Sequence, residues 1–325
     1  MEISDDLVVS AHLGRLVPFI GAGVSKIAGG PTWPEFADGI FDQLVTQGAL
    51  SYAELEQIKY KAMGPRMKIS LAAELAKDIK IKIDYKSILH SPNWKNHENG
   101  QKIYSALWRL SKRFVTTNYD LWLDETDNQL AINPANSNQD KVQPRRIIYD
   151  QNDFLGSELD VKDRETVIHL HGSIQNPESM LLTTSDYLRT YGLSHDSTRY
   201  AKNKIHHFLQ FIFQEKDILF MGYALDELEI LEYLILKKKQ IGAMERKNQK
   251  HFILQPFFKN DEKLINGVTN YFKDLEITLI PYYRDANNYD ALIDILEGYA
   301  SQMKIESPND LERKRIMGGF LDGIN

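Results

Sequence analysis

The sequence predicts an α/β fold in which a doubly wound, mostly parallel, Rossmann-like sheet carries helices on both faces, interrupted by a helical and an irregular insertion. Three observations support this prediction. Short apolar runs of strand length alternate along the 325 residues with segments that have apolar residues at helical spacing. Several of these runs end abruptly in glycine or small polar residues. Strands that are separated by helices favour parallel pairing, with helices covering both faces.

The elements follow from these patterns in chain order. The expected strands lie at residues 16–20, 113–117, 167–173, 217–221, 251–254 and 275–280, with a weaker one at 146–149. The expected helices lie near residues 36–44, 55–62, 71–79, 103–110, 205–212, 226–239 and 292–299, with a short one after residue 120. We therefore expect one catalytic domain over residues 1–305, with a helical insertion at about 50–110 and an irregular one at about 127–165. Residues 306–325 would form a tail or docking segment.

Bulk composition excludes several classes of function. The chain has no cysteine, which rules out disulfides, thiolate zinc sites and a cysteine nucleophile, and fits a reducing cytosol. No apolar stretch reaches the roughly 20 residues of a membrane span, and the first residues are acidic where a signal peptide is basic. A net charge of −6 argues against broad nucleic-acid binding. We expect a soluble cytoplasmic protein without membrane or direct nucleic-acid contacts.

The first strand ends in a glycine-rich turn, Gly21-Ala22-Gly23-Val24-Ser25. Glycines in such a turn can take a positive φ and let the backbone approach a pyrophosphate that faces the N–H groups of the turn. The full dinucleotide fingerprint would need a third glycine, which this chain lacks. A sharp corner between a strand and a loop is the alternative interpretation.

Three later strands also end in polar or glycine residues. These strand ends are Thr116-Thr117-Asn118-Tyr119-Asp120, His171-Gly172-Ser173 and Gly222-Tyr223. In a doubly wound sheet, ligands bind outside the carboxyl ends of the strands, so the four groups can converge on one crevice. Their joint occurrence is more specific than any one of them.

In this order, the four motifs resemble those of the Sir2 (sirtuin) family of NAD-consuming enzymes, especially its bacterial SIR2-like defence NADases, over about residues 10–285. The resemblance implies that Asn118 lies near the nicotinamide ribose and that His171 is the catalytic base. Asp120 would lie near the carboxamide pocket. Gly21, Ala22, Gly23 and Ser25 would hold the pyrophosphate and the adjacent ribose. Gly222, Tyr223 and Asp226 would border the adenosine. The other residues expected to bind NAD are Thr117, Gly172 and Ser173.

Two departures from the family pattern weigh against binding of acyl-lysine peptides. The four-cysteine zinc module is absent, and residues 30–36 replace the family's Gly-Ile-Pro-x-Phe-Arg segment. His169 and His171 could share a metal, but no third ligand is evident, so we expect no metal. The expected activity is hydrolysis of NAD, as substrate, to nicotinamide and ADP-ribose by an NAD-depleting effector of bacterial anti-phage defence. The alternatives are a regulatory module that binds NAD or ADP-ribose and a zinc-free ADP-ribosyl or acyl transferase.

Plainer roles remain open for several of these residues. Asn118 and Asp120 could cap the helix that follows them, Ser25 could close a turn and Tyr223 could pack. His169 is expected to be structural, and the tryptophans Trp33, Trp94, Trp108 and Trp122 are expected to be packing residues. Hydride transfer by an oxidoreductase is a weaker alternative. It would need a ribose-binding carboxylate at the end of the second strand, and Asp42, which has the required spacing, falls in a predicted helix. The resemblance also implies a homo-oligomer or a sensor partner, such as a HerA-type ATPase or a short Argonaute.

Overall fold

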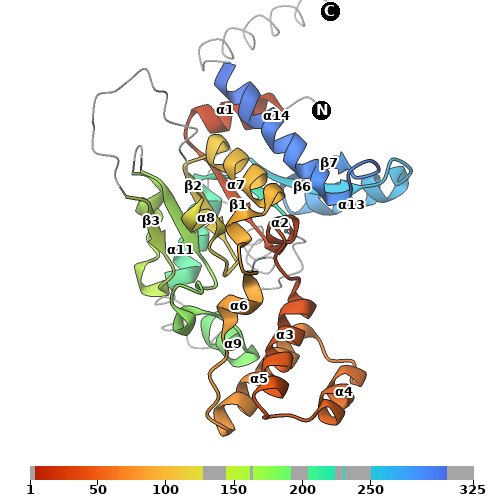
Figure 1. Ribbon diagram of the computed structural model, residues 1–325. Helices are drawn as coiled ribbons and strands as arrows, with labels where there is room; N and C mark the ends of the chain where they lie inside the picture. Colours follow the sequence, from red (N-terminus) through yellow and green to blue (C-terminus); the bar gives the residue numbers. More distant parts are fainter. Residues whose placement is uncertain are drawn as a thin grey trace, which may run out of the picture.

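The computed structural model describes residues 4–126, 144–161, 164–191, 204–223, 230 and 250–305. Its centre is a sheet of seven strands in the order β3-β4-β2-β1-β5-β6-β7, in which every neighbouring pair is parallel (Figure 1). The strands are β1 (Leu16–Ile20), β2 (Arg113–Thr116), β3 (Arg146–Ile148), β4 (Thr166–His169), β5 (Asp217–Met221), β6 (His251–Phe257) and β7 (Ile277–Tyr283). The predicted doubly wound α/β fold is confirmed.

Helices separate most of these strands. The α-helices are α1 (Asp5–His12), α2 (Ala22–Ile27), α3 (Trp33–Thr46), α4 (Tyr52–Tyr60), α5 (Pro65–Asp78), α6 (Tyr85–Leu89), α7 (Glu98–Leu110), α8 (Trp122–Glu125), α9 (Thr184–Tyr191), α11 (Lys204–Glu215), α13 (Glu262–Asp274) and α14 (Ala291–Ile305). Short 3₁₀ turns cover Trp94–Asn96, Gln151–Asp153, Gly156–Leu159, Pro177–Ser179 and Asn288–Asp290.

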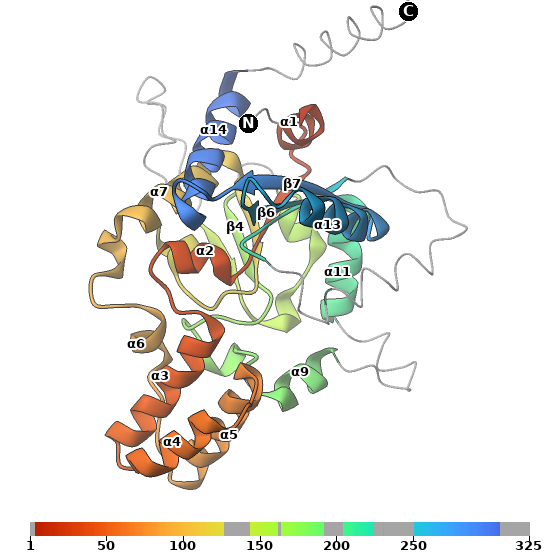
Figure 2. The ribbon, with the colours of Figure 1, turned by 90° about the vertical axis from the view of Figure 1, so that its right-hand side faces the viewer.

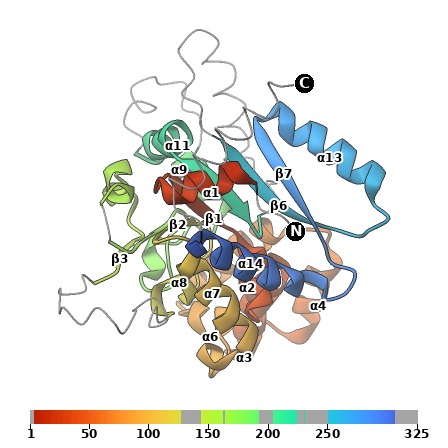
Figure 3. The same cartoon turned by 90° about the horizontal axis from the view of Figure 1, so that it is seen from above.

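Both faces of the sheet are covered, which explains why the strands read as continuous apolar runs. On one face, α7 and α14 pack beside α2 against residues such as Ile20 and Leu219. On the other face, α11 and α13 pack against residues such as Phe19 and Ile253. Figure 3 shows the two helical layers on opposite sides of the strands. The carboxyl ends of β1 and β2 thus open between these two layers.

A separate helical group consists of α3, α4 and α5. It lies below the sheet in Figures 1 and 2 and has its own apolar cluster, which includes Phe36, Leu55 and Ile69. Capping boxes start α3 and α4, where Thr32 and Ser51 each accept a hydrogen bond from the backbone three residues on. In contrast, α7 packs on the sheet.

Several elements differ from the sequence prediction. Strands β6 and β7 each extend three residues beyond their expected ends, to Phe257 and Tyr283, and the helix α13 between them was not expected. A helix, α2, begins directly at Ala22, whereas the first helix was expected only after residue 31. The fourth strand ends at His169, because the chain turns at Gly172, where φ is +85°. The last strand starts at Ile277, because the preceding Glu276 has a φ of +61°, outside the extended region.

Some predictions cannot be compared with the structure. Three predicted segments lie outside the described residues: the helix at 226–239 apart from residue 230, residues 127–143 and 162–163 of the irregular insertion, and the tail at 306–325. Within the described ranges, no helix combines the length and the apolar character that crossing a membrane requires.

Candidate functional site

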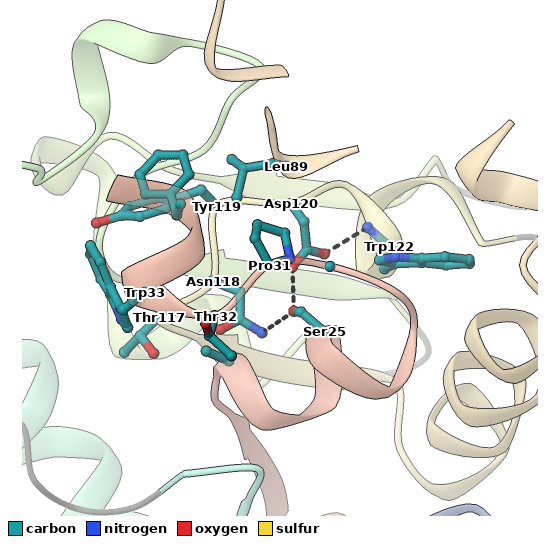
Figure 4. A pocket seen from close by; sticks show the side chains of 13 residues that line it. Ser25, Pro31, Thr32, Trp33, Leu89, Thr117, Asn118, Tyr119, Asp120 and Trp122 are labelled. Carbon is teal, nitrogen blue, oxygen red and sulfur yellow. Dashed lines mark hydrogen bonds between the residues drawn. The ribbon is translucent and has the colours of Figure 1, made fainter. Parts of the chain in front are cut away.

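A pocket opens at the carboxyl ends of β1 and β2. The space it encloses, counted with the solvent at its mouth, is about 510 Å³. The residues that line it are Ala22, Ser25, Gly30, Pro31, Thr32, Trp33, Phe36, Leu89, Thr117, Asn118, Tyr119, Asp120 and Trp122 (Figure 4). Five of these, Ala22, Ser25, Thr117, Asn118 and Asp120, were predicted as site residues.

A chain of hydrogen bonds joins the predicted polar residues in this pocket. The Asn118 side-chain amide donates to the Gly21 carbonyl oxygen at 3.0 Å and to the Ser25 hydroxyl at 2.8 Å. Ser25 in turn donates to Asp120 at 2.5 Å, as Figure 4 shows. The other carboxylate oxygen of Asp120 accepts from the backbone N–H of Trp122 at 3.0 Å. Residues nearly a hundred positions apart in the chain therefore meet at one point.

The backbone of Asn118 is fixed on both sides. Its N–H donates to the Thr116 hydroxyl at 3.0 Å, and its carbonyl oxygen accepts from Nδ1 of His169 at 2.8 Å. Asn118, Asp120 and Ser25 are all at least nine-tenths buried. The pocket thus has a rigid polar floor.

A comparison with protein-family models agrees with this arrangement of strands and motifs. Residues 112–280, just over half of the chain, match the model of the SIR2-like domain. The chain belongs to the SIR2-like family. Proteins of this family are in general NAD-dependent enzymes. A search of curated proteins gave no match.

The glycines that follow β1 pack closely against the chain that follows β5. A Cβ on Gly23 would lie 2.8 Å from the Gly222 Cα atom, and one on Gly21 would lie 2.5 Å from the Gly222 carbonyl oxygen. The N–H groups of Gly21 and Gly23 donate to the carbonyl oxygens of Met221 and Gly222. The expectation that these two N–H groups face a phosphate is therefore not met in this structure, because the neighbouring strand already accepts their hydrogen bonds.

His171 does not line the pocket. Its side chain is fully buried, and the Tyr187 hydroxyl lies 3.2 Å from Nδ1. The Arg66 guanidinium, from α5, covers the Tyr187 ring at 3.6 Å from its centroid. Burial, reinforced by the positive charge of Arg66, lowers the pKa of His171 to about 3. The structure thus encloses the predicted base under an aromatic cover.

Gly172 and Ser173 also lie outside the pocket. A Cβ on Gly172 would lie 2.2 Å from the Ser179 carbonyl oxygen, so the turn has room only for glycine. The Ser173 side chain is fully buried and accepts from the N–H of Gln175 at 3.3 Å. Both residues shape the turn that follows β4.

The late glycine segment packs, as the plainer interpretation of Tyr223 expected. The Tyr223 ring is buried beside Phe19 and Phe220, with centroids 5.4 and 5.8 Å away. Gly222 has a φ of +59° and approaches the α2 backbone. Asp226 lies outside the described residues. The described part of this segment does not reach the pocket.

Two tryptophans expected only to pack contribute walls of the pocket. Trp33 makes an edge contact with Tyr119 at 5.8 Å, and Trp122 stacks on the buried Tyr104 at 5.2 Å. Burial and the charge of Asp120 raise the pKa of Tyr104 well above its usual value, so this phenol stays neutral. The sequence contains no sign of these walls, because the spacing of residues does not show which side of an aromatic ring faces a cavity.

The described residues contain no group of three or more His, Asp or Glu side chains placed to hold a metal ion. His169, expected to be structural, bonds through Nε2 to Asp124. Asp124 was not singled out from the sequence. The sequence feature that could have identified Asp124 is its position four residues after Asp120, on the short helix that follows β2.

Proposed function

We propose that this protein is an NAD⁺ glycohydrolase that cleaves NAD into nicotinamide and ADP-ribose. The observation that carries the proposal is the hydrogen-bonded chain from Gly21 through Asn118 and Ser25 to Asp120. Amide, hydroxyl and carboxylate groups of this kind bind ribose hydroxyls and a carboxamide. The aromatic walls Trp33 and Trp122 suit a flat pyridinium ring. The pocket residues therefore fit the nicotinamide riboside half of NAD.

Cleavage of the glycosidic bond between nicotinamide and ribose needs little help from a general acid. Nicotinamide leaves as a neutral molecule, and the sugar passes through an oxocarbenium-like state. Both N–H groups of the Asn118 amide are engaged with Gly21 and Ser25. The acceptor left on this side chain is its oxygen, which can orient a water or a ribose hydroxyl. The negative charge of Asp120 would favour the positive charge that develops on the sugar.

His171 would act as the base once its cover opens. Its lowered pKa keeps the imidazole neutral at pH 7, which is the form that accepts a proton. In the described arrangement, no part of its side chain is exposed to solvent. Full activity would therefore require movement of Tyr187 and Arg66 away from this ring.

The enclosed His171 also favours a second candidate function. A module that binds NAD or ADP-ribose as a regulatory ligand needs the pocket but not an accessible base. Under this alternative, NAD binds and no nicotinamide is released.

The resemblance of the motifs to those of bacterial defence NADases supports a role as an NAD-depleting effector in anti-phage defence. Such an effector must stay inactive until it is triggered. The covered base supports regulation by a homo-oligomer or by a sensor partner. A monomer that shows full activity without any stimulus would contradict this part of the proposal.

Incubation of the pure protein with NAD, followed by chromatography of nicotinamide, tests the proposed activity. We expect release by the unaltered protein, alone or with a partner, and loss of release in Asn118→Ala. Asn266→Ala, on the exposed side of α13, is the matched control and should behave as the unaltered protein. Bound NAD that stays intact under every condition would favour the regulatory module instead.

A further inference from the structure

A buried histidine and a buried aspartate hold the backbone of Asn118 from behind the pocket. We propose that His169 and Asp124 are positioning residues that fix the Asn118 carbonyl group and thereby aim its side chain at the reacting sugar. The kinetic consequences of this inference rest on the proposed NAD hydrolysis. Neither residue lines the pocket, so both would act through Asn118.

The sheet register places His169 beside Asn118. His169 pairs with Thr116 across the ladder between β4 and β2, and Asn118 follows Thr116 by two residues. The Asn118 carbonyl oxygen, 2.8 Å from Nδ1, can only accept a hydrogen bond, so Nδ1 must carry a proton. The opposite ring nitrogen, Nε2, lies 2.8 Å from Oδ1 of Asp124. One ring therefore links the loop that holds Asn118 to the helix α8.

Asp124 is itself held in place. Its side chain is fully buried, and its second carboxylate oxygen accepts from the side-chain amide of Gln175 at 3.2 Å. The guanidinium of Arg145 donates to the carbonyl oxygens of Leu123 and Asp124 at 2.8 and 2.6 Å. The carboxylate thus presents a fixed partner to the imidazole.

When the His169 ring is protonated, it carries a positive charge next to the pocket. Burial alone would lower the pKa of His169, but the Asp124 carboxylate, the hydrogen bonds to Asp124 and Asn118, and the charge of Asp120 together raise it. A protonated ring donates from both nitrogens at once, which the two bonds require if Asp124 is ionised. The same ring would lose one of these bonds if it became neutral.

A purely structural role is the alternative, and it predicts loss of stability without a selective loss of turnover. Three variants separate the two roles. His169→Leu removes both bonds, whereas His169→Asn keeps an N–H near the position of Nδ1 and should restore part of the effect. Asp124→Asn keeps the shape and removes the charge. His251→Asn is the matched control, because His251 is also buried on a strand but lies at the amino end of β6.

Steady-state kinetics of nicotinamide release then test the inference, with thermal unfolding to confirm that each variant folds. We expect kcat to fall about 10²-fold in His169→Leu, the loss typical of a misplaced catalytic group, while KM changes little. His169→Asn should lie between this variant and the unaltered protein, and His251→Asn should keep its kcat. A folded His169→Leu variant with unchanged kcat would overturn the proposal. An equal loss of kcat in His169→Leu and in His251→Asn would overturn it too.

A readout without turnover keeps the test independent of the proposed function. Nitrogen NMR of protein labelled at histidine reports which ring nitrogens of His169 carry protons. We expect both to be protonated at pH 7 in the unaltered protein, and Nδ1 alone in Asp124→Asn. An unprotonated Nδ1 would overturn the inference. If the unaltered protein releases no nicotinamide, the proposed function fails while this measurement still decides the inference.

Discussion

Ser25 donates its hydroxyl proton to Asp120 at 2.5 Å and accepts from Asn118 through the same oxygen. Ser25 lies on the first helix after β1, and Asp120 follows β2, so one hydroxyl ties together two strand ends. The polar groups of the pocket thus form one unit, in which loss of the central hydroxyl removes one hydrogen bond from each of two buried partners.

Replacing this central hydroxyl should impair both stability and catalysis. In Ser25→Ala, Asp120 and the Asn118 amide each lose a partner, so the free energy of unfolding should fall by about 1–3 kcal/mol. Urea denaturation measures this loss, and nicotinamide release measures the accompanying drop in turnover. Ser301→Ala, at an exposed position of α14, removes only a bond to the Glu297 carbonyl and should change neither quantity. Equal behaviour of the two variants would contradict the linked pocket.

The contact between the glycine turn and β5 should tolerate no side chain. In Gly23→Ala the new Cβ would lie 2.8 Å from Gly222, so the backbone must shift and the protein should lose about 1–3 kcal/mol. Gly267→Ala is the matched control, since a Cβ there meets nothing within 4 Å. At this exposed position of α13, that change should stabilise the protein by about 0.5–1 kcal/mol. Opposite shifts in the melting temperature are expected, and shifts of the same sign would refute the packing argument.

Stability should depend on pH through His171. Its pKa is about 3 in the folded protein, below the usual value near 6.5 in the unfolded chain. Below pH 6.5 the unfolded chain therefore binds a proton that the folded protein does not, and stability is lost as pH falls toward 3. His171→Gln should remove about 1.4 kcal/mol per pH unit from this slope. Denaturation at pH 7, 6, 5 and 4 measures it, and parallel slopes for the two proteins would show that His171 is not enclosed.

The cover over His171 should depend on Arg66. Arg66→Ala removes both the charge that lowers the pKa of His171 and the group stacked on Tyr187. We expect diethyl pyrocarbonate to modify His171 faster in this variant than in the unaltered protein, as measured by peptide mass spectrometry. Arg189→Ala is the control, because Arg189 is exposed on α9 and bonds only locally to Asp186. Rapid modification of His171 in the unaltered protein would mean that the cover is open.

The sequence predicted the strands well, because buried parallel strands are short apolar runs. The limits of β1 and β5 agree with the prediction, and the weak strand at 146–149 is confirmed as β3. The meeting of Gly21, Asn118 and Asp120 was also foreseen, since the carboxyl ends of neighbouring parallel strands lie at one edge of a sheet.

The parts that were missed depend on contacts between distant segments. His171 is enclosed by Arg66 and Tyr187, which lie on two other helices, and local sequence carries no sign of that contact. The glycine turn was expected to lie against a ligand, whereas Gly222, directly after β5, fills the space beside it. Burial and backbone packing of this kind appear only once the fold is assembled.

The structure of Asn118→Ala with NAD bound would test the central claim most directly, because this variant should bind the dinucleotide without consuming it. We predict that the nicotinamide riboside lies in the pocket between Trp33 and Trp122, with its ribose beside residue 118 and Asp120. NAD bound elsewhere, with the ribose out of hydrogen-bonding reach of this pocket, would contradict the account.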